Sequence, residues 1–145
     1  MKLAIVISQF NPEVTDGLKH GAMQLLTEKA FPVANVSVYE APGAFEIPLI
    51  AQTLAQTKKF SGIICLGCVI KGDTAHFEFI SLGATLGIQQ ASLAAGIPIT
   101  FGILTTYTDE QAKVRSLPDA NNKGREAALA CLEALETLKT IKQSV

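Results

Sequence analysis

His76 is the side chain of this sequence best placed to transfer protons. It follows the segment Lys71-Gly72-Asp73-Thr74-Ala75, which offers a glycine, a hydroxyl and free backbone N–H groups at the expected start of a helix. Such a start attracts phosphate or carboxylate, because its N–H groups lack partners and the helix dipole favours negative charge. An imidazole one turn into the helix would lie beside a bound anion and could act as general acid or base. The lysine precedes the glycine, so the segment is not a P-loop.

Three more side chains stand where strands are expected to end or shortly beyond. Phe10 could stack on a flat ligand, or it could only fix the entry of the chain into a helix. Glu46 could bind a ligand or only complement the dipole of a first helical turn. Arg115 carries a guanidinium that suits a phosphate clamp, but it could equally lie on a solvated helix face. The residues alone leave these alternatives open.

Four strands and five helices are expected to position these residues. Continuous or alternating apolar residues predict strands, and apolar residues at helical spacing predict helices. The expected strands are 2–7, 35–40, 62–70 and 98–104. The first expected helix starts at Pro12 behind an Asn11 cap, and the third runs from the Thr74 region to a stop at Gly96. The other three expected helices cover 44–57, 109–116 and 122–142. Strands that alternate with helices form a parallel sheet with helices on both faces. We therefore predict one domain, residues 1–145, with a three-layer α/β sandwich of flavodoxin-like topology and ligands at the carboxyl ends of its strands.

The chain has few charged residues for its size. They make up 17% of the sequence, against about 25% in ordinary domains, and the mean hydropathy is +0.31. Low hydrophobicity and high net charge, which mark disorder, are both absent. The net charge of −1 provides no global field to attract nucleic acid or anionic lipid. A small domain with so few charges must expose apolar patches, so we expect an obligate oligomer.

The stretch from Phe79 to Thr108 carries no charged residue and raises the question of a membrane helix. About twenty predominantly apolar residues are needed to span a bilayer. Gln89, Gln90 and Pro98 interrupt the stretch, so we expect a soluble helix, a stop and a strand. A helix without charges on any side agrees with burial in an oligomer.

Three cysteines, Cys65, Cys68 and Cys131, indicate neither a disulfide framework nor a metal site. The first two lie in the expected strand 62–70, where residues three apart point to opposite faces of the sheet. They therefore cannot share a metal ion, and no second ligand pair follows. No secretory signal precedes the first strand, so we expect a cytoplasmic protein without disulfides.

Five segments together resemble the 6,7-dimethyl-8-ribityllumazine synthase family of riboflavin biosynthesis. Each is weak alone, but they occur in the family's order and spacing over essentially the whole chain. They are Gln9-Phe10-Asn11, the segment from Pro42 to Pro48, the segment from Gly67 to Glu78, the segment from Pro98 to Thr106, and Asn122-Lys123-Gly124.

The resemblance implies a transferase that requires no cofactor and no metal. The family condenses 5-amino-6-(D-ribitylamino)uracil with 3,4-dihydroxy-2-butanone 4-phosphate and releases phosphate and water. By this resemblance His76 would transfer protons. The ribitylaminouracil would contact Phe10, Ala44, Phe45, Glu46, Val69, Ile70, Phe101 and Lys123, and the butanone phosphate would contact Gly72, Asp73, Thr74 and Arg115. The Asp73 contact would come from its backbone N–H, with the carboxylate turned away from the phosphate.

The resemblance also implies partners: two small-molecule substrates and further copies of the chain. The family forms pentameric rings whose interfaces complete the active sites, and Phe101 would reach a neighbour's site. In some members the rings assemble into shells, a habit associated with an N-terminal extension that pairs with a neighbour. This chain begins at the first strand, so we expect rings rather than shells. Neither nucleic acid nor membrane is expected as a partner.

Two further departures from the family pattern concern the site. Lys71 stands where the family usually has arginine, and the two are not equivalent at a bidentate contact. Residues 116–121 replace a common Gly-Thr-Lys-x-Gly segment, so a lysine and two glycines are lost.

Other functions remain as alternatives. The archaeal-type riboflavin synthase shares the fold and the pentameric habit, but the Lys71–His76 segment favours the lumazine enzyme. A non-catalytic, flavodoxin-like flavin-binding module would need several hydroxyls after the first strand, where the loop offers Ser8 alone. A shell protein without catalysis would predict that replacing His76 changes no rate.

Overall fold

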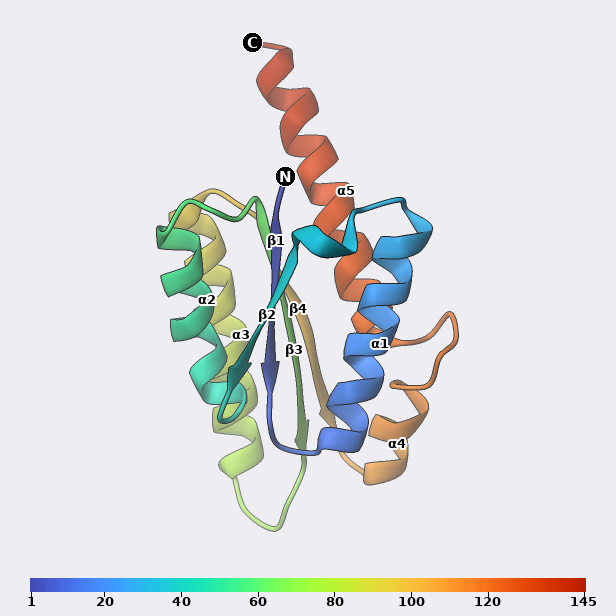
Figure 1. The fold of residues 1–145 in the computed structure, drawn as a ribbon. Helices are drawn as coiled ribbons and strands as arrows, with labels where there is room; N and C mark the ends of the chain where they lie inside the picture. Colours follow the sequence, from blue (N-terminus) through green and yellow to red (C-terminus); the bar gives the residue numbers. More distant parts are fainter.

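One parallel β-sheet organises the fold. The computed structural model describes residues 1–145. The strands are β1 (Leu3–Ser8), β2 (Val36–Ala41), β3 (Gly62–Ile70) and β4 (Ile99–Thr106), in the order β2-β1-β3-β4 across the sheet. All neighbouring strands pair in parallel, and a helical layer covers each face (Figure 1). The predicted three-layer α/β sandwich is confirmed, and its strand order is that of flavodoxin-like sheets.

The helices divide between the two faces. They are α1 (Pro12–Glu28), α2 (Ile47–Gln56), α3 (His76–Ala95), α4 (Asp109–Val114) and α5 (Lys123–Gln143). Helices α2 and α3 cover one face, and α1, α4 and α5 cover the other (Figure 1). The end of α5 projects beyond the sheet, on the side of the strands' amino ends (Figure 1).

The predicted helix 44–57 is partly wrong at its start. Ala44–Glu46 forms a 3-10 turn, and the α-helix begins at Ile47. Pro48 explains the difference, because in an unbroken α-helix its ring would clash with the carbonyl of Ala44, four residues earlier. The turn therefore places Phe45 and Glu46 on a separate segment rather than on α2.

Two further expectations concern helix ends. Gly96 ends α3 in a left-handed conformation, with φ +71°, as predicted. Asn11 stands at the N-cap position of α1, but its side chain makes no capping hydrogen bond. Its own backbone is left-handed, with φ 56°, and its amide Nδ2 instead donates to the Cys68 carbonyl over 3.4 Å. The predicted cap is thus a link between the ends of β1 and β3.

The sheet separates the hydrophobic core into two clusters, one under each helical layer. Cys65 belongs to the cluster under α2 and α3, and Cys68 to the cluster under α1 and α5. The prediction that these two cysteines face opposite sides of β3 is confirmed.

The start of α5 packs against α1 through glycines. A Cβ atom on Gly124 would overlap the backbone carbonyl of Leu18, and one on Gly21 would overlap the Asn122 side chain. Asn122 is 1% exposed, caps α5 by accepting from Arg125 N, and donates to the carbonyls of Gly17 and Leu117. This one buried amide therefore joins α1, α5 and the loop before α5.

Helix α3 covers the sheet with small side chains and turns large ones outward. Its buried residues are Ala84, Ile88 and Ala91. Its exposed apolar side chains are Phe79, Leu82, Leu86 and Leu93. None of the helices combines the length and the apolar composition that crossing a membrane requires.

Candidate active site

The loops after β1 and β2 bring an aromatic ring and a carboxylate together. A Cβ atom on Gly43 would lie 3.0 Å from Cε2 of Phe10 and 3.3 Å from Oε1 of Glu46. A side chain at Gly43 would crowd both groups, so the glycine favours their close approach to the backbone. Phe10 is 67% exposed, so a flat ligand could reach its ring and the Glu46 carboxylate could accept hydrogen bonds from the same ligand.

The 3-10 turn after β2 rests on α3. A Cβ atom on Gly83 would lie 2.8 Å from Cε1 of Phe45, so the phenyl ring packs directly on the α3 backbone. Ala44 is buried beneath the turn, while Phe45 keeps much of its surface exposed. The turn is therefore held in place by apolar contacts.

The end of β3 leads into the expected anion-binding loop. Val69 and Ile70 are half-buried at the end of the strand, and the segment from Lys71 to His76 is exposed. The backbone N–H groups of Gly72, Asp73 and Thr74 donate to no other group of the chain. Unpaired N–H groups ahead of a helix are available to an anion, so anion binding by this loop stays a prediction.

His76 is the first residue of α3 and does not lie one turn into the helix as predicted. The hydroxyl of Thr74 accepts the His76 backbone N–H over 3.3 Å, and Ala75 occupies the N-cap position. The helix therefore begins at His76, two residues after Thr74, near which its start was predicted. The imidazole is exposed, next to the anion-binding loop.

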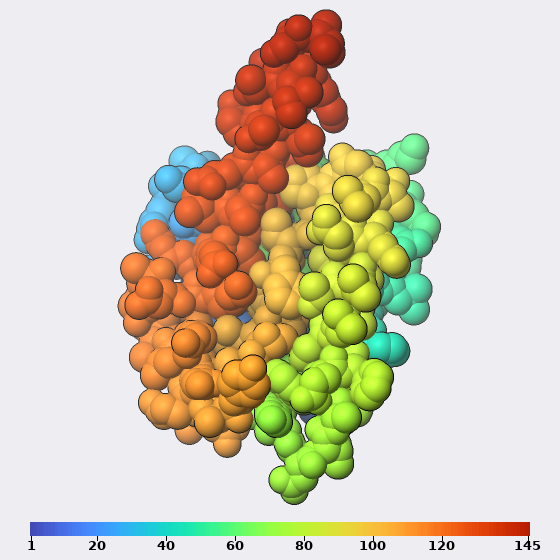
Figure 2. Space-filling model, turned by 180° about the vertical axis from the view of Figure 1, so that it is seen from behind, coloured from blue at the N-terminus to red at the C-terminus, as the bar shows by residue number.

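A second group of expected site residues lies beside β4. An open groove of about 800 Å³ runs between this strand, the loop before α5 and the first turns of α5. Phe101, Arg115, Lys123 and Glu126 all line it. Seen from behind, β4 is visible between α3 and the C-terminal helices (Figure 2). As an outer strand, β4 has one edge without a partner strand.

Arg115 and the loop after it are held by hydrogen bonds. Its Nη1 donates to the Gln111 carbonyl over 3.0 Å, and its own carbonyl accepts from Lys123 N over 2.9 Å. Within the loop, Asp119 caps Asn121 N with its carboxylate. The 116–121 segment thus forms a closed turn despite lacking the family's two glycines.

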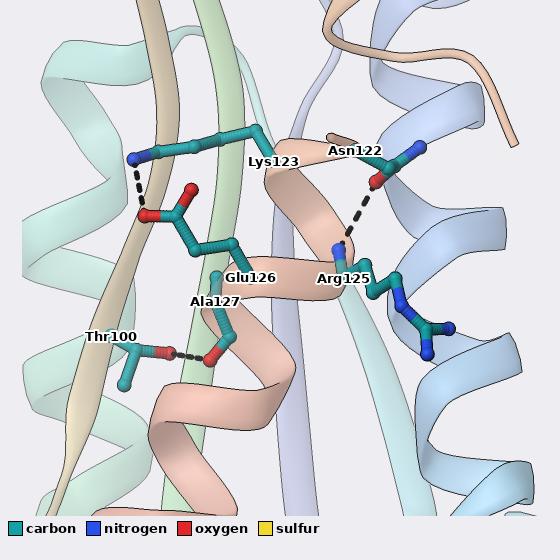
Figure 3. Close-up of polar contacts among 6 residues, drawn as sticks. All are labelled: Thr100, Asn122, Lys123, Arg125, Glu126 and Ala127. Carbon is teal, nitrogen blue, oxygen red and sulfur yellow. Dashed lines mark hydrogen bonds and ion pairs between the residues drawn. The ribbon is translucent and has the colours of Figure 1, made fainter. Parts of the chain in front are cut away.

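The first turn of α5 presents two faces with different roles (Figure 3). Lys123 and Glu126 point toward β4 and form an ion pair of 3.1 Å over the groove. Asn122 and Arg125 point toward α1, where Arg125 bonds Glu28. Asn122 and Gly124 are thus structural, and Lys123 is the member of this motif that reaches the groove.

Phe10 and Glu46 do not meet the groove residues within one chain. Phe10 and Glu46 follow β1 and β2, whereas the groove lies along β4 and is lined by neither of them. β2 and β4 are the outer strands of the sheet, about 14 Å apart at the usual strand spacing. We call the residues after β1, β2 and β3 the loop group, and those beside β4 the groove group.

Two residues in contact with the site were missed from the sequence. Tyr107 follows β4 and lies against the anion-binding loop, where only a polar loop was expected. The sequence signal that could have pointed to Tyr107 is an aromatic residue directly after the carboxyl end of a strand. Asn11 was assigned a capping role, and the signal for its left-handed backbone was the residue type, since asparagine adopts this conformation more often than most residues.

The cysteines take no part in either group. Burial raises the pKa of all three thiols, to about 11 for Cys68, where Asp109 adds to the effect, and to about 12 for Cys131. The thiolate is the reactive form, so we expect no labelling of the native protein by Ellman's reagent at pH 8. Three thiols per chain should react in guanidinium chloride. Rapid labelling of the native protein would contradict this burial.

The same pKa shifts predict how stability depends on pH. Folding favours the neutral thiols, so their contribution is fully present below the ordinary pKa of 9.0 and is lost as pH rises through the raised values. The free energy of unfolding should therefore fall between pH 9 and 11 in urea titrations. The free energy of unfolding of the Cys68→Ser variant should fall less steeply over this range.

Comparison with known proteins decides the family. The family model described as 6,7-dimethyl-8-ribityllumazine synthase matches residues 1–139. The chain belongs to the 6,7-dimethyl-8-ribityllumazine synthase family. The resemblance drawn from the five sequence segments is thereby confirmed.

Curated members of the family match over nearly their whole lengths. The chain is 61% identical over 143 residues to 6,7-dimethyl-8-ribityllumazine synthase 1 of Caulobacter vibrioides, covering 99% of this chain and 94% of that one. It is 45% identical to the synthase of Syntrophus aciditrophicus, covering 97% and 92%, and 44% identical to that of Deinococcus deserti, covering 99% and 92%. The loop group and the groove group both lie within these matches.

Proposed function

We propose that this chain, acting as one domain, condenses 5-amino-6-(D-ribitylamino)uracil with 3,4-dihydroxy-2-butanone 4-phosphate to 6,7-dimethyl-8-ribityllumazine. Phosphate and water are the other products. The observation that carries the proposal is the 61% identity to a curated synthase over almost the entire chain. The convergence of Phe10, Glu46 and the anion-binding loop at one edge of the sheet supports it.

The loop group would hold the ribitylaminouracil. Phe10 offers a ring for stacking on the pyrimidine, and the Glu46 carboxylate beside it suits the hydroxyls of the ribityl chain. Ala44 and Phe45 would contact the same chain through the 3-10 turn. Val69 and Ile70, at the end of β3, would offer backbone groups to the uracil edge.

The anion-binding loop would hold the phosphate of the second substrate. Gly72, Asp73 and Thr74 supply unpaired N–H groups, which stabilise the phosphate first as part of the substrate and then as leaving group. Asp73 would act through its backbone, with its carboxylate in solvent. Arg115 would add a guanidinium that suits bidentate contacts to phosphate oxygens.

The chemistry needs proton transfers and close placement of two reactive molecules. The amine adds to the ketone, water leaves as an imine forms, phosphate is eliminated, and the ring closes. Each step moves a proton, and His76 beside the anion-binding loop can relay it. Both substrates are already reactive, so holding them together should supply much of the acceleration.

We further propose a ring of five chains in which the groove group of one chain completes the loop group of its neighbour. The separation of Phe10 and Glu46 from the groove on one chain supports this, as do the unpaired edge of β4 and the exposed apolar face of α3. Phe101, Lys123 and Arg115 would then contribute to the adjacent subunit's site. We also propose a cytoplasmic location, which the three unpaired cysteines favour. Light scattering of the full chain tests the ring, and a stable monomer at micromolar concentration would exclude it.

The decisive experiment mixes both substrates with the protein and follows lumazine absorbance and phosphate release together. We expect both products to appear in equal amounts, much faster than in the uncatalysed mixture. Folded protein that gives no acceleration would refute the proposed activity.

Replacing His76 by alanine should lower kcat by about a hundredfold, the lower end of the usual range for general acid–base groups. We expect the lower end of this range because His76 is exposed, so water can partly take over its proton transfers. Affinity for the lumazine product should change less than about twofold, as fluorescence titration would show. His20→Ala, at an exposed histidine of α1, is the matched control and should behave as wild type. Loss of product affinity with unchanged kcat would assign His76 to binding instead.

A further inference from the structure

The ring of Tyr107 contacts the residues on both sides of the anion-binding loop, residues 72–76. Tyr107 follows β4, and the ammonium of Lys71 lies 5.7 Å from the centroid of its ring. The ring of Phe77 lies 6.0 Å from Tyr107, tilted by 45°. Lys71 directly precedes the loop and Phe77 directly follows His76, so Tyr107 contacts residues on both sides of the segment from Gly72 to His76.

The loop itself has little else to hold it. Gly72 and Asp73 make no hydrogen bond within the chain, and a Cβ atom at Gly72 would meet no atom within 4 Å. The hydrogen bond between Thr74 and His76 is internal to the segment. A segment with so few contacts would otherwise sample many conformations, at an entropic cost when a ligand orders it.

Tyr107 is itself held in place. Its backbone N–H donates to Oε1 of Gln111 over 2.8 Å, which ties it to α4. The adjacent Thr106 carbonyl accepts the Lys71 backbone N–H over 2.9 Å. The ring is therefore positioned by β4 and α4, and it can transmit that position to the loop.

The contact also fixes where the Lys71 charge lies. Lys71 forms no ion pair with a carboxylate, so its ammonium is not neutralised. A cation over an aromatic face within about 6 Å is attracted by the ring quadrupole, and the aromatic pair is within the usual 4.5–7 Å range. Lysine thus has a defined place here, although it replaces the family's usual arginine.

We propose that Tyr107 is a positioning residue for the phosphate of the butanone substrate, acting through Lys71 and Phe77 to fix the two ends of the anion-binding loop. This inference rests on the proposed function for the identity of the substrate. Tyr107 does not touch the phosphate; it sets the spacing of the loop N–H groups and keeps the Lys71 charge beside them.

The test compares Tyr107→Leu with Tyr107→Phe, which keeps the ring and loses only the hydroxyl. We expect Tyr107→Leu to raise the KM for the butanone phosphate about fivefold, in keeping with one lost cation–π and one lost aromatic contact. The kcat and the KM for the ribitylaminouracil should stay within about twofold. Tyr107→Phe should match wild type, because a phenyl ring still attracts the ammonium.

Variants of Lys71 supply a second, independent readout. Lys71→Met should raise the same KM at least as much, whereas Lys71→Arg should leave it unchanged because a guanidinium also stacks on a ring. The double variant Lys71→Met/Tyr107→Leu should raise this KM by less than the product of the two single effects, since both single variants remove the contact between Lys71 and Tyr107, whereas only Tyr107→Leu removes the Phe77 contact. Fully additive effects would show that the two residues act separately and would overturn the proposal.

Binding of inorganic phosphate, measured by calorimetry, separates this inference from the proposed reaction. Weaker phosphate binding by Tyr107→Leu, with wild-type binding by Tyr107→Phe, supports the inference even if no lumazine forms. Equal phosphate affinity and equal KM in the two Tyr107 variants would overturn it even if the enzyme is active. Tyr107 is 66% exposed, so folding should survive, and circular dichroism verifies this.

Discussion

Replacing Arg115 by alanine is expected to raise the KM for the butanone phosphate by about 10- to 100-fold and to leave that for the ribitylaminouracil unchanged. Hydrogen bonds to charged groups contribute about 1.5–3 kcal/mol, which corresponds to this range. In the structure the guanidinium makes one exposed hydrogen bond, to the Gln111 carbonyl. The side chain is thus available for a ligand, and steady-state kinetics with each substrate varied in turn measure the effect.

Two variants control the Arg115 experiment. Arg115→Lys keeps the charge but not the planar fork, so it should recover only part of the loss. Lys113→Ala removes an exposed cation of α4, two residues before Arg115, that forms no ion pair, and it should have little effect. An equal rise in KM for both substrates would mean that Arg115 shapes the groove rather than binding phosphate.

Replacing Gly124 by alanine is expected to destabilise the fold by about 3 kcal/mol or more, the upper end for overpacking. The added methyl group would overlap a backbone carbonyl, that of Leu18, which cannot rotate away as a side chain can. To relieve the overlap α5 must move off α1, which also strains the buried Asn122 hydrogen bonds. Urea unfolding of the variant and the wild type gives the difference in free energy of unfolding, and both are measured at the same protein concentration because association in the proposed ring would contribute to it.

Gly72→Ala is the matched control for stability. No atom lies within 4 Å of a Cβ atom at Gly72, and its φ is not positive, so the free energy of unfolding should change by less than about 0.5 kcal/mol. If Gly124→Ala were equally mild, the close approach of α1 and α5 would be adjustable, and the glycine would have no packing role.

The helices and strands with strong local sequence patterns could be predicted from the sequence. The continuous apolar run of β3 indicated a strand covered on both faces, and Gly96 marked the end of α3 because only a left-handed residue fits there. The start of α2 was placed too early, because Pro48 fits a helix that begins at Ile47 but would clash with the Ala44 carbonyl in one that begins at Ala44. The capping role of Asn11 was wrong because its partner, the Cys68 carbonyl, lies on another strand.

The candidate site could be predicted as a set of residues but not as an arrangement. Phe10, Glu46 and His76 were proposed because each follows a strand, and parallel strands end at one edge of the sheet. The separation of Phe10 and Glu46 from Phe101 and Arg115 depends on the order of the strands, which spacing along the chain does not encode. Tyr107 was missed for a similar reason, since its contact with Lys71 joins two loops that are distant in sequence.

The division between the loop group and the groove group has a genetic consequence. In the proposed ring, each site combines His76 of one chain with Arg115 of its neighbour. Two impaired proteins, His76→Ala and Arg115→Ala, could therefore partly rescue one another when they assemble together, because about a quarter of the sites in a random one-to-one mixture would combine an intact His76 with an intact Arg115. A cell with two such defective copies of the gene would regain part of its riboflavin synthesis, and neither mutation would behave as a simple loss of function.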